Sequence, residues 1–294
     1  MANILDFVPS DGSMQEATLE KLDTIITNTG GSSASLGDPF IQQAENVALS
    51  TYSDVINVQT KAKNLLKFGR NKLVNVTKST LMTLPVGIDN ETYLSSNLIT
   101  QISSSSASDT GDIIVEGHTS SDGLTFTFSK QTVTLTGQTA VVLATPICRV
   151  SRVVNDGSSD LVGNIYVAQT DTLTAGVPDT DTKVHCIVES GLNNSEKAAT
   201  TMSSTDYWII TSFYADCLEK TATFGTVHLE VRESGKTFIN KVDIAASTNS
   251  PGRHEFKPYL VVPKNSDIRM RISASAVNKD FSGGIDGMLA SVTV

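Results

Sequence analysis

Cysteines, aromatic residues and charges are all scarce in this chain. Of its 294 residues, 6% are aromatic and 18% are charged, and only three are cysteines. Cys148, Cys186 and Cys217 are odd in number and lack CxxC spacing, so neither a disulfide framework nor a zinc site is predicted. We expect each of them to be a small buried hydrophobic side chain.

Long apolar runs are also missing. No stretch approaches the ~18 apolar residues of a transmembrane helix, and the opening MANILDFVPSDG lacks the basic and apolar regions of a signal peptide. The formal net charge of −9 argues against a general nucleic-acid-binding protein, which needs a basic face. We therefore expect a soluble protein made in a cytoplasm, with no nucleic-acid partner and no membrane insertion.

Catalytic motifs are absent as well. There is no GxSxG, no HExxH, no P-loop and no GxGxxG after a strand. The four histidines are scattered through strand-like segments: His118, His185, His228 and His254. The acidic loop with Asp171, Asp179 and Asp181 lacks the order of a calcium-binding EF-hand. We predict no enzymatic activity, no cofactor and no metal site.

Strand-forming residues dominate what is present. From residue 73 onward, short segments rich in Val, Ile, Thr and Phe alternate with Ser, Asp, Gly and Asn clusters. The spacing predicts a mainly β protein with two antiparallel, sandwich or jelly-roll-like domains. The first domain is expected over 73–190 and the second over 207–294, with a linker or long loop over 191–206.

The first 72 residues have a different, helical pattern. Ser13 and Glu16 form a capping box, and a flexible Gly/Ser linker follows near 30–37. Apolar residues then recur at steps of three and four, which predicts a helix that ends at Gly69. The seam consists of Ile41, Ala44, Ala48, Thr51, Val55, Val58, Ala62 and Leu65. It fits either a self-associating stem or an amphipathic helix that packs on its own β-domain.

Positive charge is concentrated at the end of this predicted stem. No acidic residue occurs between Asp54 and Asp89. The same window holds six cations: Lys61, Lys63, Lys67, Arg70, Lys72 and Lys78. They could simply lie on the solvated side of a helix end, where they favour its dipole. The alternative is a docking patch of Lys63, Lys67, Arg70 and Lys72 that holds the acidic body or a neighbouring chain.

Several segments together resemble a known class of protein. They are LLKFGRN at 65–71, QISSSSASDTGDIIVEGHTSSDG at 101–123, PICRVSRVVNDGSSDLVGNIYVA at 146–168 and VPKNSDIRMRISASAVNKDFSGGIDGMLA at 263–291. In this order they resemble virion structural proteins of tailed bacteriophages, particularly those of marine and cyanobacterial phages. The resemblance implies a non-enzymatic part of the particle exterior, such as a head decoration, a head or neck fibre or a tail-associated protein, and often a trimer. It supplies no matched functional residue.

Two functions follow from these observations. The first is a structural virion component, a homotrimer in contact with capsid, neck or tail proteins. The second is a receptor- or glycan-binding module of the virion, which would need exposed aromatic side chains on loops. Phe281 in NKDFSGG is the main candidate for such a residue. A depolymerase would need a close pair of carboxylates, and no such pair can be derived from the spacing.

Overall fold

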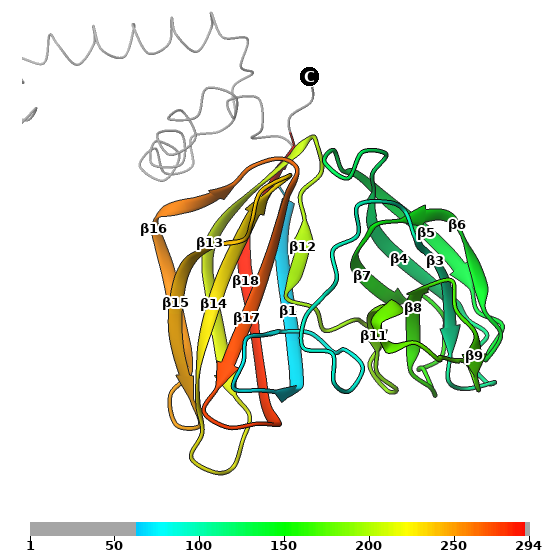
Figure 1. Ribbon diagram of the computed structural model, residues 1–294, viewed down its shortest axis with the longest axis horizontal. Coiled ribbons are helices and arrows are strands. Elements are labelled where there is room, and N and C mark those ends of the chain that lie inside the picture. The colour runs from blue at the N-terminus through cyan, green and yellow to red at the C-terminus, as the bar shows by residue number, and fades with distance from the viewer. Residues whose placement is uncertain (1–62, 292–294) are drawn as a thin grey trace, which may run out of the picture. The chain divides into compact units, whose positions relative to one another are not determined.

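The structure of the protein is a computed structural model that describes residues 63–291. These residues form eighteen β-strands and a single 3₁₀ helix, η2, at Asp181–Lys183 (Figure 1). All strand pairs are antiparallel, which confirms the prediction of a mainly β protein. The predicted capped helix, the Gly/Ser linker and the seam from Ile41 to Ala62 lie outside the described residues.

One sandwich is built from both ends of the described chain. Its first sheet has the order β1-β18-β13-β16, and its second the order β12-β17-β14-β15, with β2 also paired to β17. The strands are β1 (Lys63–Val74), β2 (Ser79–Thr80), β12 (Ala199–Thr201), β13 (Asp206–Cys217), β14 (Phe224–Glu233), β15 (Ile239–Ser247), β16 (Gly252–Val262), β17 (Ser266–Ala274) and β18 (Lys279–Ser291). Its core includes Trp208, Phe213 and Met270.

The other sandwich is formed by the middle of the chain. Its sheets have the orders β11-β8-β3-β6 and β5-β4-β7, and a small two-stranded sheet pairs β9 with β10. The strands are β3 (Ile99–Ser104), β4 (Asp112–Thr119), β5 (Thr127–Thr134), β6 (Val141–Ile147), β7 (Arg149–Asn155), β8 (Ile165–Gln169), β9 (Leu173–Thr174), β10 (Val177–Pro178) and β11 (Val184–Val188). Its core includes Ile102, Val115 and Val167. We call the two units the middle sandwich and the terminal sandwich.

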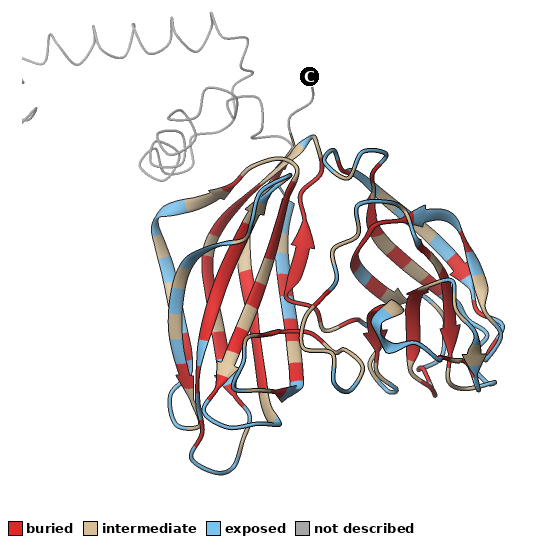
Figure 2. Cartoon of the chain, viewed as in Figure 1, coloured by how far each residue is buried: buried red, intermediate tan, exposed pale blue. Residues whose placement is uncertain are grey.

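Burial alternates along many of these strands because successive side chains point to opposite faces (Figure 2). In β17, for example, Ile268, Met270 and Ile272 enter the core of the terminal sandwich. Arg269 and Arg271, between them, lie on the outer face. The alternation of apolar and charged residues in the sequence therefore assigns one face of β17 to the core and the other to the outer surface.

The helix predicted up to Gly69 is wrong over its last residues, since 63–74 form strand β1. Lys67, Gly69 and Asn71 face inward, whereas Leu66 and Phe68 face outward, which is a period of two. β1 pairs with β18 from Lys63 opposite Leu289 to Val74 opposite Lys279. Pairing with β18 satisfies the backbone groups of β1 that would otherwise bond within a helix. The helical spacing of Ala62 and Leu65 in the sequence is too weak a preference to prevent strand formation here.

The chain therefore crosses between the two sandwiches twice. It begins in the terminal sandwich with β1 and β2, builds the middle sandwich from β3 to β11, and returns through β12. β12 lies within the stretch 191–206 that we predicted as a linker or long loop, and it pairs with β17 from Ala199 opposite Arg269. Within residues 63–291 no helix is long and apolar enough to cross a membrane.

Candidate functional site at the junction of the two sandwiches

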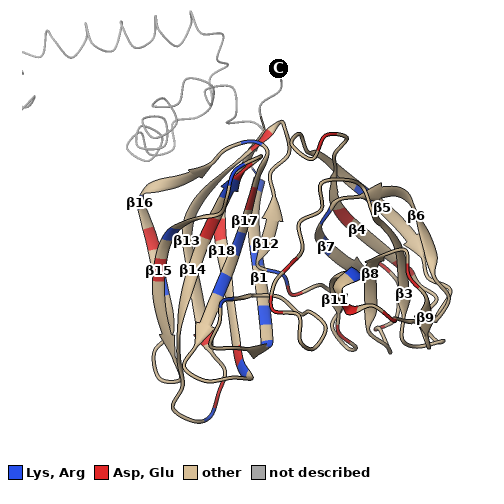
Figure 3. Cartoon of the chain, in the orientation of Figure 1, with Lys and Arg blue, Asp and Glu red and all other residues tan. Residues whose placement is uncertain are grey.

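Polar side chains concentrate where β1 and β17 of the terminal sandwich meet β7 of the middle sandwich. Lys and Arg residues occur at several positions along β1 and β17 (Figure 3). Lys67 is only 7% exposed, and its Nζ donates a hydrogen bond to the backbone oxygen of Ser151 at 2.8 Å. Thr200 Oγ1 of β12, in the other sheet of the terminal sandwich, donates to Ser151 Oγ at 3.3 Å. β7 is thus held from both β1 and β12.

Burial changes the acid–base chemistry of this junction. Desolvation of the ammonium group, together with the nearby positive charge of Lys197, lowers the pKa of Lys67 to about 8. Lys197 is itself buried and forms an ion pair with Glu91. Since an unpaired buried charge is costly, both lysines require the partners that the folded chain gives them.

The other cations of the predicted docking patch also have contacts within the chain. Arg70 forms a bidentate ion pair with Asp280, at 3.0 Å from Nε and 2.6 Å from Nη2. Lys72 forms an ion pair with Glu189 of the middle sandwich. Lys63 is exposed at the start of β1. The four cations therefore do not form one continuous surface, and Lys67 lies in the interior.

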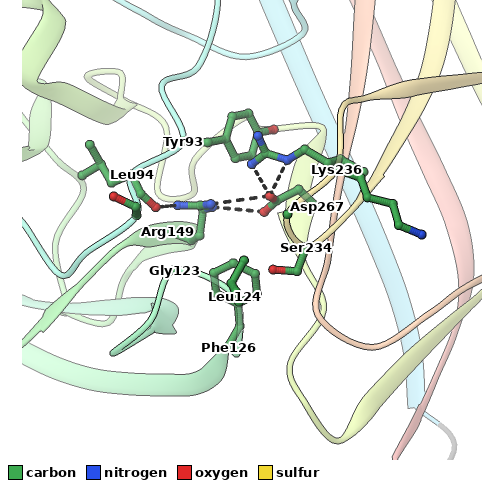
Figure 4. A pocket seen from close by; sticks show the side chains of 12 residues that line it. Tyr93, Leu94, Gly123, Leu124, Phe126, Arg149, Ser234, Lys236 and Asp267 are labelled. Atoms are coloured by element: carbon green, nitrogen blue, oxygen red, sulfur yellow. Dashed lines mark hydrogen bonds and ion pairs between the residues drawn. The ribbon is translucent and has the colours of Figure 1, made fainter.

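A second link joins β7 to the terminal sandwich through Asp267 on β17. The Asp267 carboxylate accepts a hydrogen bond from Arg149 Nε of β7 at 3.0 Å and from Arg232 Nε of β14 at 3.1 Å (Figure 4). Thr201 Oγ1 donates to the same carboxylate at 2.6 Å. Burial opposes ionisation of Asp267, but the two guanidinium groups and these hydrogen bonds keep its pKa below the usual range.

Aromatic rings pack around this ion cluster. Tyr93 and Phe238 lie with their ring centroids 5.1 Å apart. The Arg232 guanidinium carbon is 4.6 Å from each centroid, and that of Arg269 is 3.7 Å from the Phe238 centroid. Such cation–π contacts strengthen when water is excluded. The segment with Tyr93 is consequently fastened to the outer face of the β14–β17 sheet.

Two histidines of the middle sandwich are buried close to these cations. Desolvation lowers the pKa of His118 to about 3 and that of His185 to about 4, and the positive charges of Lys67 and Lys197 act in the same direction. His118 Nδ1 lies 3.2 Å from Ser151 Oγ, so His118 belongs to the same polar group as Lys67. Both histidines are therefore neutral at pH 7.

A pocket opens beside the Asp267 cluster, between the β4–β5 loop and the turn that joins β14 to β15. Its volume is about 180 Å³. It is lined by Tyr93, Leu94, Ser95, Gly123, Leu124, Phe126, Arg149, Arg232, Ser234, Gly235, Lys236 and Asp267 (Figure 4). Because the lining comes from both sandwiches and from residues up to 174 positions apart, no local sequence pattern indicates this pocket.

The remaining site predictions have mixed outcomes. Leu65 of the predicted seam is half-buried and packs against the core of the terminal sandwich. Phe281, predicted as an exposed loop aromatic, is in β18 and completely buried, so this prediction is wrong. The prediction for the cysteines is confirmed, since Cys148, Cys186 and Cys217 are buried free thiols. Among residues 63–291, no three His, Cys, Asp or Glu side chains gather as a metal site would require.

No protein-family model and no curated protein matches this chain. Among solved structures, a chain in the structure of the infectious bursal disease virus Gt strain is 12% identical, with a TM-score of 0.16, over 86% of this chain and 77% of that one. A chain of the infectious bursal disease virus VP2 subviral particle is 13% identical, with the same TM-score, over 86% and 78%. A TM-score of 0.16 is at the level of unrelated folds, so the function proposed below rests on this chain's own sequence and geometry.

Proposed function

We propose that the protein is a non-enzymatic structural component of a bacteriophage particle, displayed on the virion exterior as a capsid decoration, a fibre or a neck- or tail-associated protein. It assembles as a symmetric homotrimer and contacts other virion proteins. The observation that carries the proposal is the pairing of two segments that resemble phage virion proteins. KFGRN at 67–71 and SGGIDG at 282–287 lie side by side in β1 and β18, from Lys67 opposite Ile285 to Arg70 opposite Ser282.

The junction between the sandwiches supports a mechanical role. Arg149 and Asp267 are both nearly fully buried and satisfy one another, and Lys67 donates to a backbone oxygen. A catalytic group needs to be available to a reacting molecule, whereas these groups are used to hold two domains together. Two sandwiches fixed in this way form a stiff body, which suits a protein that transmits load or covers a surface.

Purified particles of the phage that encodes the chain test this proposal directly. We expect mass spectrometry to detect the chain in several copies per particle. Antibodies raised against residues 63–291 should bind intact particles in electron micrographs. Absence of the chain from purified particles would refute the virion assignment, and labelling only of disrupted particles would refute exterior display.

Light scattering tests the assembly state. We expect the full chain to have three times the mass of the 31.3 kDa monomer. A shortened chain that starts at Asn57 keeps the whole compact unit of residues 57–294 and removes most of the predicted seam. A trimer that becomes a monomer on shortening would assign assembly to the seam, and a trimer in both would assign it to the sandwiches. A full-length monomer would contradict the homotrimer.

A further inference from the structure

The ion pair of Glu91 and Lys197 is among the most deeply buried in the described part of the chain. The Glu91 side chain is 4% exposed and the Lys197 side chain is 1% exposed. Glu91 lies in the connection from β2 to β3, and Lys197 lies 106 positions later in the connection from β11 to β12. These connections are the two crossings of the chain between the sandwiches. The pair therefore links the two crossings to each other.

Few polar contacts compensate for the burial of these two charges. Lys197 Nζ donates to Glu91 Oε1 and has no other acceptor among residues 63–291. Glu91 Oε2 is buried and has no hydrogen-bond partner among the same residues. A buried ion pair is favourable only when the remaining donors of the ammonium and the remaining lone pairs of the carboxylate are satisfied. An amide carries no net charge and needs fewer partners, so it fits these surroundings better than the two ions.

The surroundings of the pair also suit the neutral forms of its two groups. The Lys67 ammonium adds a like charge near Lys197, and the buried Cys186 thiol lies near both members of the pair. Exclusion of water reduces the preference of a buried pair for its charged forms. Transfer of one proton from the ammonium to the carboxylate then gives a free amine beside a carboxylic acid. The fold holds these two reacting groups together, which replaces an encounter in solution.

We propose that Lys197 Nζ and Glu91 Cδ are joined by an isopeptide bond, which the folded chain forms without a cofactor or a second protein. The amine nitrogen attacks Cδ, the N–C bond forms, and one C–O bond breaks as the hydroxyl group leaves with a proton from the nitrogen. One ammonium and one carboxylate thus become one amide and one water, with no change of oxidation state. The neutral imidazole of His185 is available to carry the proton, since it contacts the backbone of Thr92, beside Glu91, and lies near Lys197.

A bond at this position closes residues 91–197 into a covalent loop. The loop contains every strand of the middle sandwich, from β3 to β11. As with a disulfide, a bond that closes a long loop restricts the unfolded chain. A force that pulls on the two ends of the chain would also pass through the bond and bypass the middle sandwich. The inference goes beyond the structural role and does not rest on it, because the bond is a property of the isolated chain.

The mass of the purified full chain tests the inference. Because the bond forms with loss of one water, we expect the denatured chain to be about 18 Da lighter than its sequence mass of 31.3 kDa. Trypsin cleaves after Lys and Arg, so an unlinked chain gives the separate peptides 79–130, 184–197 and 198–220. A lysine in an amide bond is not cleaved. The linked chain should therefore give one branched peptide of 79–130 and 184–220, which tandem mass spectrometry identifies.

Two variants and one control connect the mass deficit to this pair. Lys197→Met and Glu91→Ala each remove one reacting group, so both should have the full mass of their sequences. Lys72→Met is the matched control and should keep the deficit, because Lys72 pairs with Glu189 between the same two sandwiches but is 46% exposed. The branched peptide of the native chain identifies the bond directly, so the inference remains testable if a variant fails to fold.

Several results would overturn the inference. They are a native chain with its full sequence mass, a deficit that remains in Lys197→Met or Glu91→Ala, and a branched peptide that joins other residues. A cyclic imide at an Asp–Gly sequence, such as Asp286-Gly287, also lacks one water, but it opens in mild base whereas an isopeptide bond persists. A deficit that disappears in mild base would therefore overturn the inference too. None of these results affects the particle experiment above, so failure of this inference is distinguishable from failure of the proposed function.

Discussion

Gly69 of β1 and Gly283 of β18 lie directly opposite one another, and both face the interior of the terminal sandwich. A Cβ on Gly69 would collide with the backbone of Leu81 and Ala198, and one on Gly283 would lie 2.6 Å from the backbone oxygen of Tyr214. Leu81, which is completely buried, occupies the space that the two missing side chains leave. The KFGRN and SGGIDG motifs therefore pair at glycines, because a side chain at either position would collide with neighbouring backbone.

This close approach predicts a large effect of Gly69→Ala. The added methyl group meets backbone atoms, which cannot rotate away, so we expect the free energy of unfolding to fall by about 3 kcal/mol. Urea-induced unfolding followed by circular dichroism measures the change. Gly111→Ala is the matched control, because its Cβ would make an ordinary 3.6 Å contact with Gly157, and we expect little change there. Equal effects of the two variants would contradict the packing argument.

The buried carboxylate of Asp267 is predicted to be essential for the joined arrangement. In Asp267→Asn the guanidinium groups of Arg149 and Arg232 lose their countercharge, and we expect a loss of about 3–5 kcal/mol in the free energy of unfolding. Chemical denaturation measures it. Glu233→Gln breaks the exposed pair with Lys236 and serves as the control, with no measurable change expected. A stable Asp267→Asn protein would show that the ion pairs do not hold the sandwiches together.

The two buried histidines predict loss of stability in acid. In the unfolded chain a histidine binds its proton near pH 6.5, whereas the pKa values of folded His118 and His185 are about 3 and 4. Stability is therefore complete above pH 6.5 and falls as the pH decreases from 6.5 toward 4. The slope is up to ~1.4 kcal/mol per pH unit for each histidine.

Denaturation at several pH values measures this slope. His185→Gln should remove about half of the histidine-dependent slope between pH 6.5 and 4, whatever its effect on stability at pH 7. His254→Gln, a partly buried histidine on β16, is the control and should keep the native slope. An unchanged slope in His185→Gln would mean that His185 is not held neutral by burial.

Lys67 predicts a pH dependence of the same sign in alkaline solution. Its pKa is about 8 in the folded chain and near 10.5 in the unfolded chain, so the unfolded state binds more protons between these values. This residue's contribution to stability therefore increases as the pH rises from 8 to 10.5. In Lys67→Met this increase should be missing, whatever the effect of the lost hydrogen bond to Ser151 on stability at pH 7.

The difference in the free energy of unfolding between the native chain and Lys67→Met, measured from pH 8 to 10.5, separates the contribution of Lys67 from that of other groups that titrate in this range. Lys130→Met, at an exposed lysine on β5, is the control and should keep the native alkaline profile. A native profile in Lys67→Met as well would contradict the lowered pKa of Lys67.

The position of β1 predicts which shortened chains fold. A chain that starts at Leu73 lacks nearly all of β1 and leaves β18 unpaired along one edge. It also loses Leu65 and Lys67, which contact the core and Ser151. We expect it to bind hydrophobic dyes and to unfold without a cooperative transition, whereas a chain that starts at Asn57 should unfold cooperatively. Cooperative unfolding of both would show that β1 is dispensable.

The sequence was a good guide wherever a pattern is local. Alternation of apolar and polar residues predicted the antiparallel β architecture, and the lack of paired cysteine motifs predicted three buried thiols. It failed for Phe281, because NKDFSGG reads as a loop although it is the start of an inner strand, β18. Asp and Gly residues are typical of turns, but here Gly283 and Gly284 allow close contact with Leu81 and Tyr214.

By itself the sequence determined most of the strands between residues 99 and 274, because the pattern of side chains along an extended backbone is a local property. Only the tertiary structure decided that KNLLKFGRNK is a strand, since its partner β18 lies more than 200 residues further along the chain. The same holds for the burial of Lys67 and for the pocket beside Asp267, which both depend on the way the two sandwiches meet. Long-range pairing outweighs local helical spacing because it satisfies the backbone and buries the core together.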